Sequence, residues 1–318
     1  MATESATNPN LPIILSDEQT EEYLRFLKFT EDDIEKIREP NLENLSVLMV
    51  RQLATAPFCN IDIHYSQAHQ IVIDISYIFN KVIRRKRGGY CMELNTLFSH
   101  LLATLGYNTW LAPARVSRER TGNVDDRNFH GISHVVNLIE FDNGKIYLVD
   151  VAYGGPTIVQ PMELFEGNTK DSIGAEKHRL IKATIPELRM KKPHWILQFK
   201  ATMDDLWVDL YMFFEIEATL RDCEIWSNWT SSREGIFLKN IIAARVIREG
   251  NKPVGKYILF NSNIKRKFYA GVEDLPELTN EEERVKALKD FWGIELSQDD
   301  QEAIRGREPE IRIQSELR

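Results

Sequence analysis

The spacing of apolar residues divides the chain into a helical first part and a β-rich remainder. Residues 16–19 read Ser-Asp-Glu-Gln, the form of a capping box, and the apolar positions that follow keep helical spacing until Pro40. A second helical pattern covers residues 42–53 and stops before Pro57. We therefore expect helices to dominate about the first 90 residues.

Beyond Gly106 the chain turns to short runs of β-prone residues. These runs are 109–116, 134–141, 145–151, 195–201, 236–247 and 256–260. Their spacing favours an antiparallel sheet or barrel over βαβ units. The stretch 163–192 is polar and poorly periodic, so we expect it on the surface, and a capping box at 279–282 predicts a last helix. The order of elements indicates an α+β fold with the helices first.

Composition and charge argue against several classes of protein. The chain has 318 residues and a formal net charge of −8, which is unlike a general nucleic-acid binder. No apolar run approaches the roughly 20 residues of a membrane span, and residues 1–12 form a polar tail without the order of a signal peptide. The three cysteines are too few and too scattered for a disulfide framework or a zinc site. We expect a cytoplasmic protein without a metal, a membrane anchor or a nucleic-acid partner.

The segment 87–95 carries the most chemical information and reads Arg-Gly-Gly-Tyr-Cys-Met-Glu-Leu-Asn. After Cys91, apolar residues recur at helical intervals up to Gly106, which ends the pattern. Cys91 therefore lies in the first turn of a helix, where free N–H groups and the helix dipole favour a thiolate. The alternative is a buried cysteine that only packs, which is how we interpret Cys59 and Cys223.

A nucleophilic thiolate needs a base, and the base needs a group that orients it. His134 begins an apolar strand, and Asp150 ends the next one. A carboxylate at the end of an apolar strand needs a partner, because burying an unpaired charge is costly. A hairpin that carries both residues would complete a Cys91–His134–Asp150 triad. A His–Asp pair that only ties the hairpin together is the alternative.

The turn between these two strands decides whether His134 and Asp150 meet. A two-residue turn would send their side chains to opposite faces of the hairpin. A three-residue loop at 142–144 would place Val136 opposite Asp150 and make His134 and Asp150 diagonal neighbours, about 7–8 Å apart at the backbone. Gly144 suits the third position of such a loop, which adopts a left-handed conformation. We therefore predict the three-residue loop, with Gly144 at positive φ.

Taken in order, these motifs resemble the arylamine N-acetyltransferase family. The resemblance rests on Arg-Gly-Gly-aromatic-Cys at 87–91, on His134 before an apolar strand, on Val-Asp-Val-Ala-Tyr-Gly-Gly at 149–155, on Pro-Phe-Cys-Asn-Ile at 57–61 and on Phe-Trp-Gly-Ile at 291–294. It extends over about residues 15–300. The long polar stretch and the acidic tail are similar to those of eukaryotic, fungal-type members.

The resemblance implies a fold of three parts around a Cys-His-Asp core like that of the cysteine proteases. We accordingly expect a helical bundle that carries the nucleophile over residues 1–106, an antiparallel β-barrel with a polar surface insertion over 107–205, and an α/β lid with a charged tail over 206–318. The implied activity transfers an acetyl or malonyl group from acetyl-CoA or malonyl-CoA to a small aromatic amine or hydrazine, in xenobiotic detoxification. No obligatory protein partner is implied.

The resemblance also assigns roles to individual residues. It makes Cys91 the acylated nucleophile, His134 its base and Asp150 the group that orients the base. The positions that match the aromatic-amine pocket are Phe58 and Tyr153. The positions expected near coenzyme A are His130, Gly131, Thr230, Ser231 and Ser232. The basic runs 84–86 and 265–267 are candidates for its phosphates, or are solvated surface charges.

Two sites depart from the family pattern. The usual Glu after Phe58 is replaced by Cys59, so a carboxylate for Arg87 is missing, and we expect another acid, Glu93 or Asp62, to take its place. Small residues follow Asp150 at positions 155 and 157, where some relatives carry larger or charged side chains. This second departure suggests a roomier pocket.

Two other functions share parts of this pattern. A papain-like or transglutaminase-like thiol hydrolase has the same chain order of Cys, His and Asp. A binding protein that sequesters small aromatic molecules could keep the fold without the reaction. An acyl adduct on Cys91 that an arylamine discharges would distinguish the acyltransferase from both.

Overall fold

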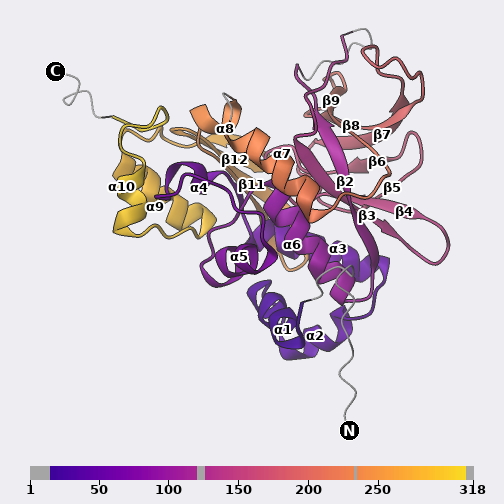
Figure 1. Cartoon of the computed structure of the whole chain (residues 1–318), viewed down its shortest axis with the longest axis horizontal. Coiled ribbons are helices and arrows are strands. Elements are labelled where there is room, and N and C mark those ends of the chain that lie inside the picture. Colours follow the sequence, from indigo (N-terminus) through magenta and orange to yellow (C-terminus); the bar gives the residue numbers. More distant parts are fainter. Residues whose placement is uncertain (1–14, 120–125, 233–234, 313–318) are drawn as a thin grey trace.

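The computed structural model describes residues 15–119, 126–232 and 235–312, so the tail expected at residues 1–12 lies outside the described part. Two antiparallel sheets lie on either side of a group of helices (Figure 1). One sheet has eight strands in the order β5-β4-β3-β2-β9-β8-β7-β6, and the other has five in the order β1-β10-β11-β12-β13. The α+β fold class predicted from the sequence is confirmed.

Helices make up most of the first part of the chain, as the sequence predicted. They are α1 (Asp17–Phe26), α2 (Glu31–Ile37), α3 (Leu42–Thr55), α4 (Ile61–His64), α5 (Ile75–Phe79), the π-helical turn η1 (Asn80–Arg84) and α6 (Cys91–Thr104). The capping box at Ser16 forms, because its hydroxyl accepts a hydrogen bond from Gln19 N. The sequence predicted one apolar face for α6, but all residues from Cys91 to Leu102 are buried. The reason is that α5 packs on one side of α6 and strands of the eight-stranded sheet on another.

The eight-stranded sheet nearly closes into a barrel. Its strands are β2 (Asn108–Val116), β3 (His134–Glu140), β4 (Ile146–Val149), β5 (Met162–Glu163), β6 (Thr169–Asp171), β7 (Lys177–Ala183), β8 (His194–Lys200) and β9 (Val208–Phe213). Between the two edge strands, Asn168 Nδ2 donates to Glu163 O at 2.7 Å. The sheet includes β9, so the barrel extends past the boundary expected at residue 205.

The prediction that 163–192 is a surface insertion is wrong for part of this stretch. It contains β6 and β7, and β7 pairs with β8 along its whole length. The side chains of His178 and Leu180 point inward and are buried, whereas those of Lys177 and Arg179 between them are not. A histidine occupies the buried position 178 and an isoleucine the less buried position 181, so apolar and polar residues do not alternate regularly, which explains why the sequence did not indicate a strand.

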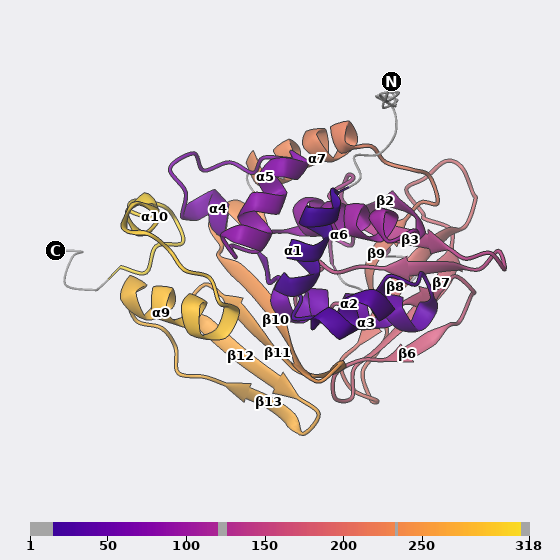
Figure 2. The same cartoon turned by 90° about the horizontal axis from the view of Figure 1, so that it is seen from below.

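The last part of the chain forms the five-stranded sheet and its helices. Its elements are α7 (Leu220–Ser232), α8 (Ile236–Lys239), β10 (Ile242–Glu249), β11 (Lys252–Phe260), β12 (Asn263–Phe268), β13 (Gly271–Asp274), α9 (Glu281–Trp292) and α10 (Gln298–Ala303). The short strand β1 (Phe58–Cys59) joins this sheet at β10. Figure 2 shows β10 to β13 side by side, with the bundle helices above them. The strand expected at 236–247 begins only at Ile242, because α8 occupies the first residues of that run.

The described part of the charged tail is packed against the fold. Ile304 is buried, and Arg284 Nη1 donates to Pro309 O at 2.9 Å. Ile311 N donates to Glu281 Oε1 at 2.8 Å. Residues 309–311 of the charged tail therefore dock onto α9.

Candidate active site

Cys91 is the first residue of α6, and the turn before it sets its position. Gly88 has a φ of 67°, and a Cβ at this residue would lie 2.4 Å from Pro57 O, so only glycine fits. Gly89 O accepts a hydrogen bond of 2.7 Å from Cys59 N, which ties the turn to β1. The Cys91 thiol lies 3.7 Å from Ser133 O, its hydrogen-bond acceptor. The nucleophile candidate thus faces the residue before His134.

The hairpin that carries the other two triad candidates has the predicted register. Asn137 lies opposite Val149, and the ladder continues to Glu140 opposite Ile146. Phe141 N donates to Lys145 O, which closes a three-residue loop, and Gly144 has a φ of 74°. The prediction of a three-residue loop with Gly144 at positive φ is confirmed.

As this register requires, His134 and Asp150 meet on one face of the hairpin. His134 Nε2 lies 2.8 Å from Asp150 Oδ2, and both side chains are buried. Burial alone would lower the pKa of His134, but the charge and hydrogen bond of Asp150, together with the Cys91 side chain, raise it to about 10. Because Nε2 is bound to Asp150, Nδ1 is the ring nitrogen left for Cys91.

Two tyrosines enclose the imidazole. The ring centroids of Tyr153 and Tyr211 lie 5.4 and 5.0 Å from that of His134. Tyr153 OH donates to Leu210 O at 3.0 Å, which fixes its ring. Burial, and then the charge and hydrogen bond of Asp150, raise the pKa of Tyr211 well above its ordinary value, so this phenol is neutral. Sequence analysis did not identify Tyr211, because it comes from β9, far along the chain from the hairpin.

Asn95 connects the helix of Cys91 to the hairpin of His134 and Asp150. Its Nδ2 donates to Asp150 Oδ1 at 2.9 Å and to Val135 O at 2.8 Å. Its Oδ1 accepts from Val151 N at 3.0 Å. Sequence analysis quoted Asn95 within a motif but assigned it no role. The available signal was an amide one helical turn after Cys91, on the same face of the helix.

A buried group of charges supports the turn before Cys91. Arg87 Nη2 lies 2.7 Å from Asp62 Oδ1, and Lys81 Nζ lies 2.9 Å from Asp62 Oδ2 and 2.7 Å from Glu93 Oε1. Burial would raise the pKa of Asp62, but the charges of Lys81 and Arg87 lower it to about 2. Asp62 therefore supplies the carboxylate that Arg87 needs, and Glu93 pairs with Lys81.

Cys59, which stands where the family usually has Glu, lies beside this group of charges. Its thiol donates to Arg87 O at 3.2 Å. Burial raises the pKa of the Cys59 thiol to about 12, although the charge of Lys81 opposes this shift. A thiol with so high a pKa has no nucleophilic character at neutral pH, in agreement with the packing role expected for it.

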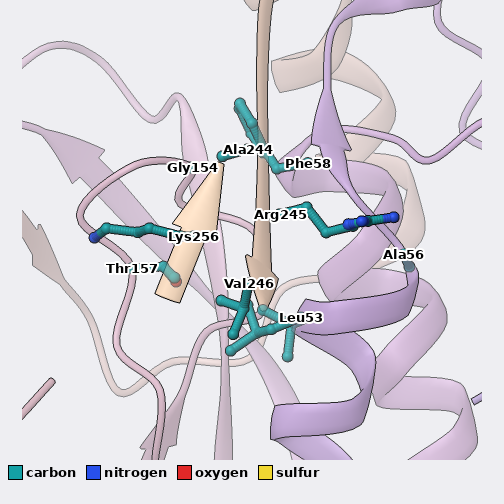
Figure 3. A pocket seen from close by; sticks show the side chains of 10 residues that line it. Leu53, Ala56, Phe58, Gly154, Thr157, Ala244, Arg245, Val246 and Lys256 are labelled. Carbon is teal, nitrogen blue, oxygen red and sulfur yellow. The ribbon is translucent and has the colours of Figure 1, made fainter. Parts of the chain in front are cut away.

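Phe58 lies in β1, an edge strand of the five-stranded sheet, and borders a very small cavity. A Cβ at Gly154 would lie 3.3 Å from Phe58 Cε1, so loop and ring are in close contact. The cavity has a volume of about 10 Å³, enough for one water molecule. Figure 3 shows its lining, which consists of Leu53, Ala56, Phe58, Val151, Gly154, Thr157, Ala244, Arg245, Val246 and Lys256. At Gly155 itself little space is left, because a Cβ there would meet Ile258 Cδ1 at 3.3 Å; the roomier pocket expected there stays a prediction.

The residues expected near coenzyme A lie in two places. His130 and Gly131 are exposed in the loop before β3. The other three end α7, and their hydroxyls donate to carbonyls one turn earlier: Thr230 to Trp226, Ser231 to Ser227 and Ser232 to Asn228. Helix α7 also reaches the nucleophile turn, because Tyr90 OH donates to Ser227 Oγ.

Acidic partners neutralise most of the two basic runs that were candidates for the phosphates. Lys265, Arg266 and Lys267 lie within 4 Å of carboxylates of Asp274, Glu273 and Glu176 respectively. Arg84 pairs with Glu22 at 2.9 Å. Arg85 and Lys86 are exposed and remain candidates.

The described residues hold neither a candidate metal cluster nor a membrane-spanning helix. They contain no group of three or more His, Cys, Asp or Glu side chains placed to hold a metal ion. In the same ranges, none of the helices has the length and apolar character needed to cross a bilayer. All three cysteines are free and buried.

Known proteins resemble the chain along most of its length. A family model described as N-acetyltransferase matches residues 41–301. An N-malonyltransferase, FDB2, of Fusarium pseudograminearum is 27% identical over 91% of this chain and 92% of its own. The pineal gland isozyme NAT-10 of arylamine N-acetyltransferase from Gallus gallus is 27% identical over 82% of this chain and 90% of its own.

Solved structures share the fold. The arylamine N-acetyltransferase of Mycobacterium marinum in complex with CoA superposes with a TM-score of 0.75 at 24% identity, covering 92% of this chain and 99% of that one. The enzyme of Mycobacterium abscessus also has a TM-score of 0.75, at 23% identity, covering 90% and 93% of the two chains. At this identity the likeness establishes the arrangement of helices, barrel and second sheet.

Proposed function

The chain belongs to the arylamine N-acetyltransferase family, and we propose that it transfers an acyl group from an acyl-CoA to an aromatic amine through a thioester on Cys91. The observation that carries this proposal is the buried contact of His134 with Asp150 beside a cysteine that begins a helix. The donor is acetyl-CoA or malonyl-CoA, and the acceptor is a small arylamine or arylhydrazine. Detoxification of foreign amines in the cytoplasm is the physiological role we propose.

In the first half-reaction the Cys91 thiolate attacks the carbonyl carbon of the acyl-CoA. A new carbon–sulfur bond forms to Cys91 as the carbon–sulfur bond to coenzyme A breaks, and His134 gives a proton to the departing thiolate. One thioester replaces another, so this step is nearly isoenergetic. The N–H groups at the start of α6 that precede Glu93, whose own N–H donates to Tyr90 O, are suited to stabilise the oxyanion.

In the second half-reaction the amine nitrogen attacks the acyl-Cys91 carbonyl. His134 takes a proton from the nitrogen, and Cys91 leaves as a thiolate, which restores the starting state. Asp150 keeps the imidazole oriented and stabilises its charged form through Nε2. Phe58 and Tyr153 supply the aromatic surfaces against which we place the acceptor ring.

The two donor candidates rest on different relatives. The fungal N-malonyltransferase resembles the chain over a larger share of its length than the avian arylamine N-acetyltransferase does. We place the pantetheine and phosphates of either donor along His130 and Gly131 on one side and the end of α7, Thr230 to Ser232, on the other. The loop of His130 and Gly131 leads to Ser133, whose carbonyl oxygen accepts from the Cys91 thiol, and α7 bonds to Tyr90 through Ser227.

Intact-mass measurement tests the proposal directly. The protein is mixed with acetyl-CoA or malonyl-CoA, and one acetyl or malonyl group should add to Cys91 and disappear when an arylamine is supplied. Steady-state kinetics with both donors and one arylamine then identify the preferred donor. Absence of an adduct with either donor, or hydrolysis of the adduct at the same rate with and without amine, would refute the proposal.

A further inference from the structure

The loop 150–157 carries much of the proposed acceptor site. It begins at Asp150, it holds Tyr153 against His134, and its Gly154 touches the Phe58 ring. The position of this loop therefore sets the space between the barrel, which carries His134, and the five-stranded sheet, which carries Phe58. An aromatic ring bound between them would be sensitive to small shifts of the loop.

Among the side-chain hydrogen bonds of the loop, three hold its second half from different directions. Thr157 Oγ1 donates to Asp150 O at 3.3 Å, within the loop itself. From the barrel, His178 Nε2 donates to Pro156 O at 2.9 Å. From the five-stranded sheet, Lys256 Nζ donates to Gly155 O. Lys256 thus provides the link to the sheet that carries Phe58.

Lys256 is a buried cation with a buried partner. Its exposed fraction is 2%, and its ammonium lies 2.8 Å from Glu176 Oε2, whose residue is 3% exposed. Glu176 belongs to the barrel segment before β7 and also pairs with Lys267 of β12 at 2.9 Å. Burying such charges is costly, and packed apolar residues would often stabilise a fold as well. A role in positioning the loop 150–157 would explain why this buried ion pair is present.

The strand register shows what Lys256 positions. Phe58 of β1 lies opposite Ala244 of β10, which lies opposite Ile258 of β11. Lys256 is two residues before Ile258, so it projects from the same face of the sheet, and Ile258 contacts the loop at Gly155. Figure 3 shows that Arg245, on the neighbouring strand, extends in the opposite direction from Lys256.

We propose that Lys256 is a positioning residue for the acceptor: by holding Gly155, it fixes the distance between the Phe58 ring and the Tyr153 and His134 rings. This inference rests on the proposed function. It assigns Lys256 no contact with substrate and no part in forming the acyl-enzyme. Glu176 orients the ammonium of Lys256 through their ion pair.

The test compares Lys256→Met with Lys265→Met. Lys265 is an exposed lysine of β12 whose ion pair with Asp274 is long, at 3.6 Å, so its loss should change nothing. For both variants, acyl-enzyme formation is followed by intact mass, and KM is measured for a one-ring and a two-ring arylamine. We expect Lys256→Met to raise the acceptor KM about tenfold and to alter the ratio of the two KM values, with the acylation rate within about twofold of wild type.

Two more variants keep the inference testable if Lys256→Met folds poorly. Lys256→Arg retains a charged donor and should recover most of the acceptor affinity, whereas Glu176→Gln should raise the acceptor KM less than Lys256→Met does. An unchanged acceptor KM in folded Lys256→Met or Glu176→Gln protein would overturn the inference, as would an equal loss in both half-reactions. If the wild-type protein itself forms no acyl-enzyme, it is the proposed function that fails.

Discussion

Asp150 Oδ1 accepts a hydrogen bond of 2.9 Å from Nδ2 of Asn95, one helical turn after Cys91. The same amide group bonds to the backbone at Val135 and Val151. One side chain thus joins the helix of the nucleophile to both strands of the hairpin. The distance between Cys91 and His134 therefore depends on Asn95, which is neither the nucleophile nor the base.

Replacing Asn95 by Ala should lower the free energy of unfolding by about 2–4 kcal/mol. The change leaves the buried Val151 N–H without its partner and leaves Asp150 Oδ1 with one donor, Ala152 N, instead of two. Urea unfolding measures the loss. Asn108→Ala is the control, because its amide bonds to Glu140 at the surface, and we expect less than about 0.5 kcal/mol. Equal stability of the Asn95 variant and the control would contradict this interpretation of the amide.

Cys91→Ala should abolish acyl transfer and leave the fold intact. Activity with acyl-CoA and an arylamine should fall at least about a thousandfold, because no other group can carry the acyl chain. Cys223→Ala is the matched control, since that thiol is also buried, and burial raises its pKa to about 12. A folded Cys91→Ala protein with a tenth of normal activity would rule out the covalent route.

Asp150→Asn should slow transfer about a thousandfold or more with little change in acceptor affinity. The carboxylate raises the pKa of His134 to about 10, and its removal leaves a neutral imidazole at neutral pH. Alkylation of Cys91 by iodoacetamide should therefore be slower than in wild type at about pH 6.5. If the alkylation profile of the variant matches that of wild type, Asp150 does not act through His134.

Restoring the family's usual carboxylate by Cys59→Glu should destabilise this protein by about 3–5 kcal/mol. The nearby cations already have partners, since Lys81 and Arg87 share Asp62, and a further buried carboxylate would have none. Adding Asp62→Asn should recover part of the loss. Urea unfolding of the two single variants and the double variant measures this coupling, and simple additivity would show that Asp62 has not replaced the missing acid.

The stability of the protein should decrease as the pH falls from about 6.5 towards 4. Burial lowers the pKa values of His64 and His178 to about 4, against about 6.5 in the unfolded chain. Between these values the unfolded chain binds protons that the folded chain does not, so the free energy of unfolding falls. His178→Gln should flatten this slope more than His130→Gln, because burial also lowers the pKa of His130 but the residue is exposed. The free energy of unfolding of all three proteins, measured in urea at several pH values, tests this prediction.

Local interactions explain why parts of the site could be predicted from sequence. The helical spacing after Cys91 and the glycine pair before it placed the thiol at a helix start, which depends only on neighbouring residues. The loop at 142–144 set the register of the hairpin, and the register brought His134 to Asp150. These relations span few residues, so backbone geometry alone determines them.

Contacts between distant segments were decided only by the tertiary structure. Tyr211 encloses His134 from another strand, and Asp62, one of two acids expected beside Arg87, is the one that pairs with it. Lys256 reaches Gly155 across the junction of two sheets. Tyr, Asp and Lys are also common at protein surfaces, so the residue type alone did not indicate these buried contacts. By itself, the sequence determined the α+β order of elements and the unit formed by the nucleophile helix and the hairpin, because local spacing encodes both. The remaining contacts were determined by tertiary packing, because a charge or a ring acquires its neighbour only when separate elements come together.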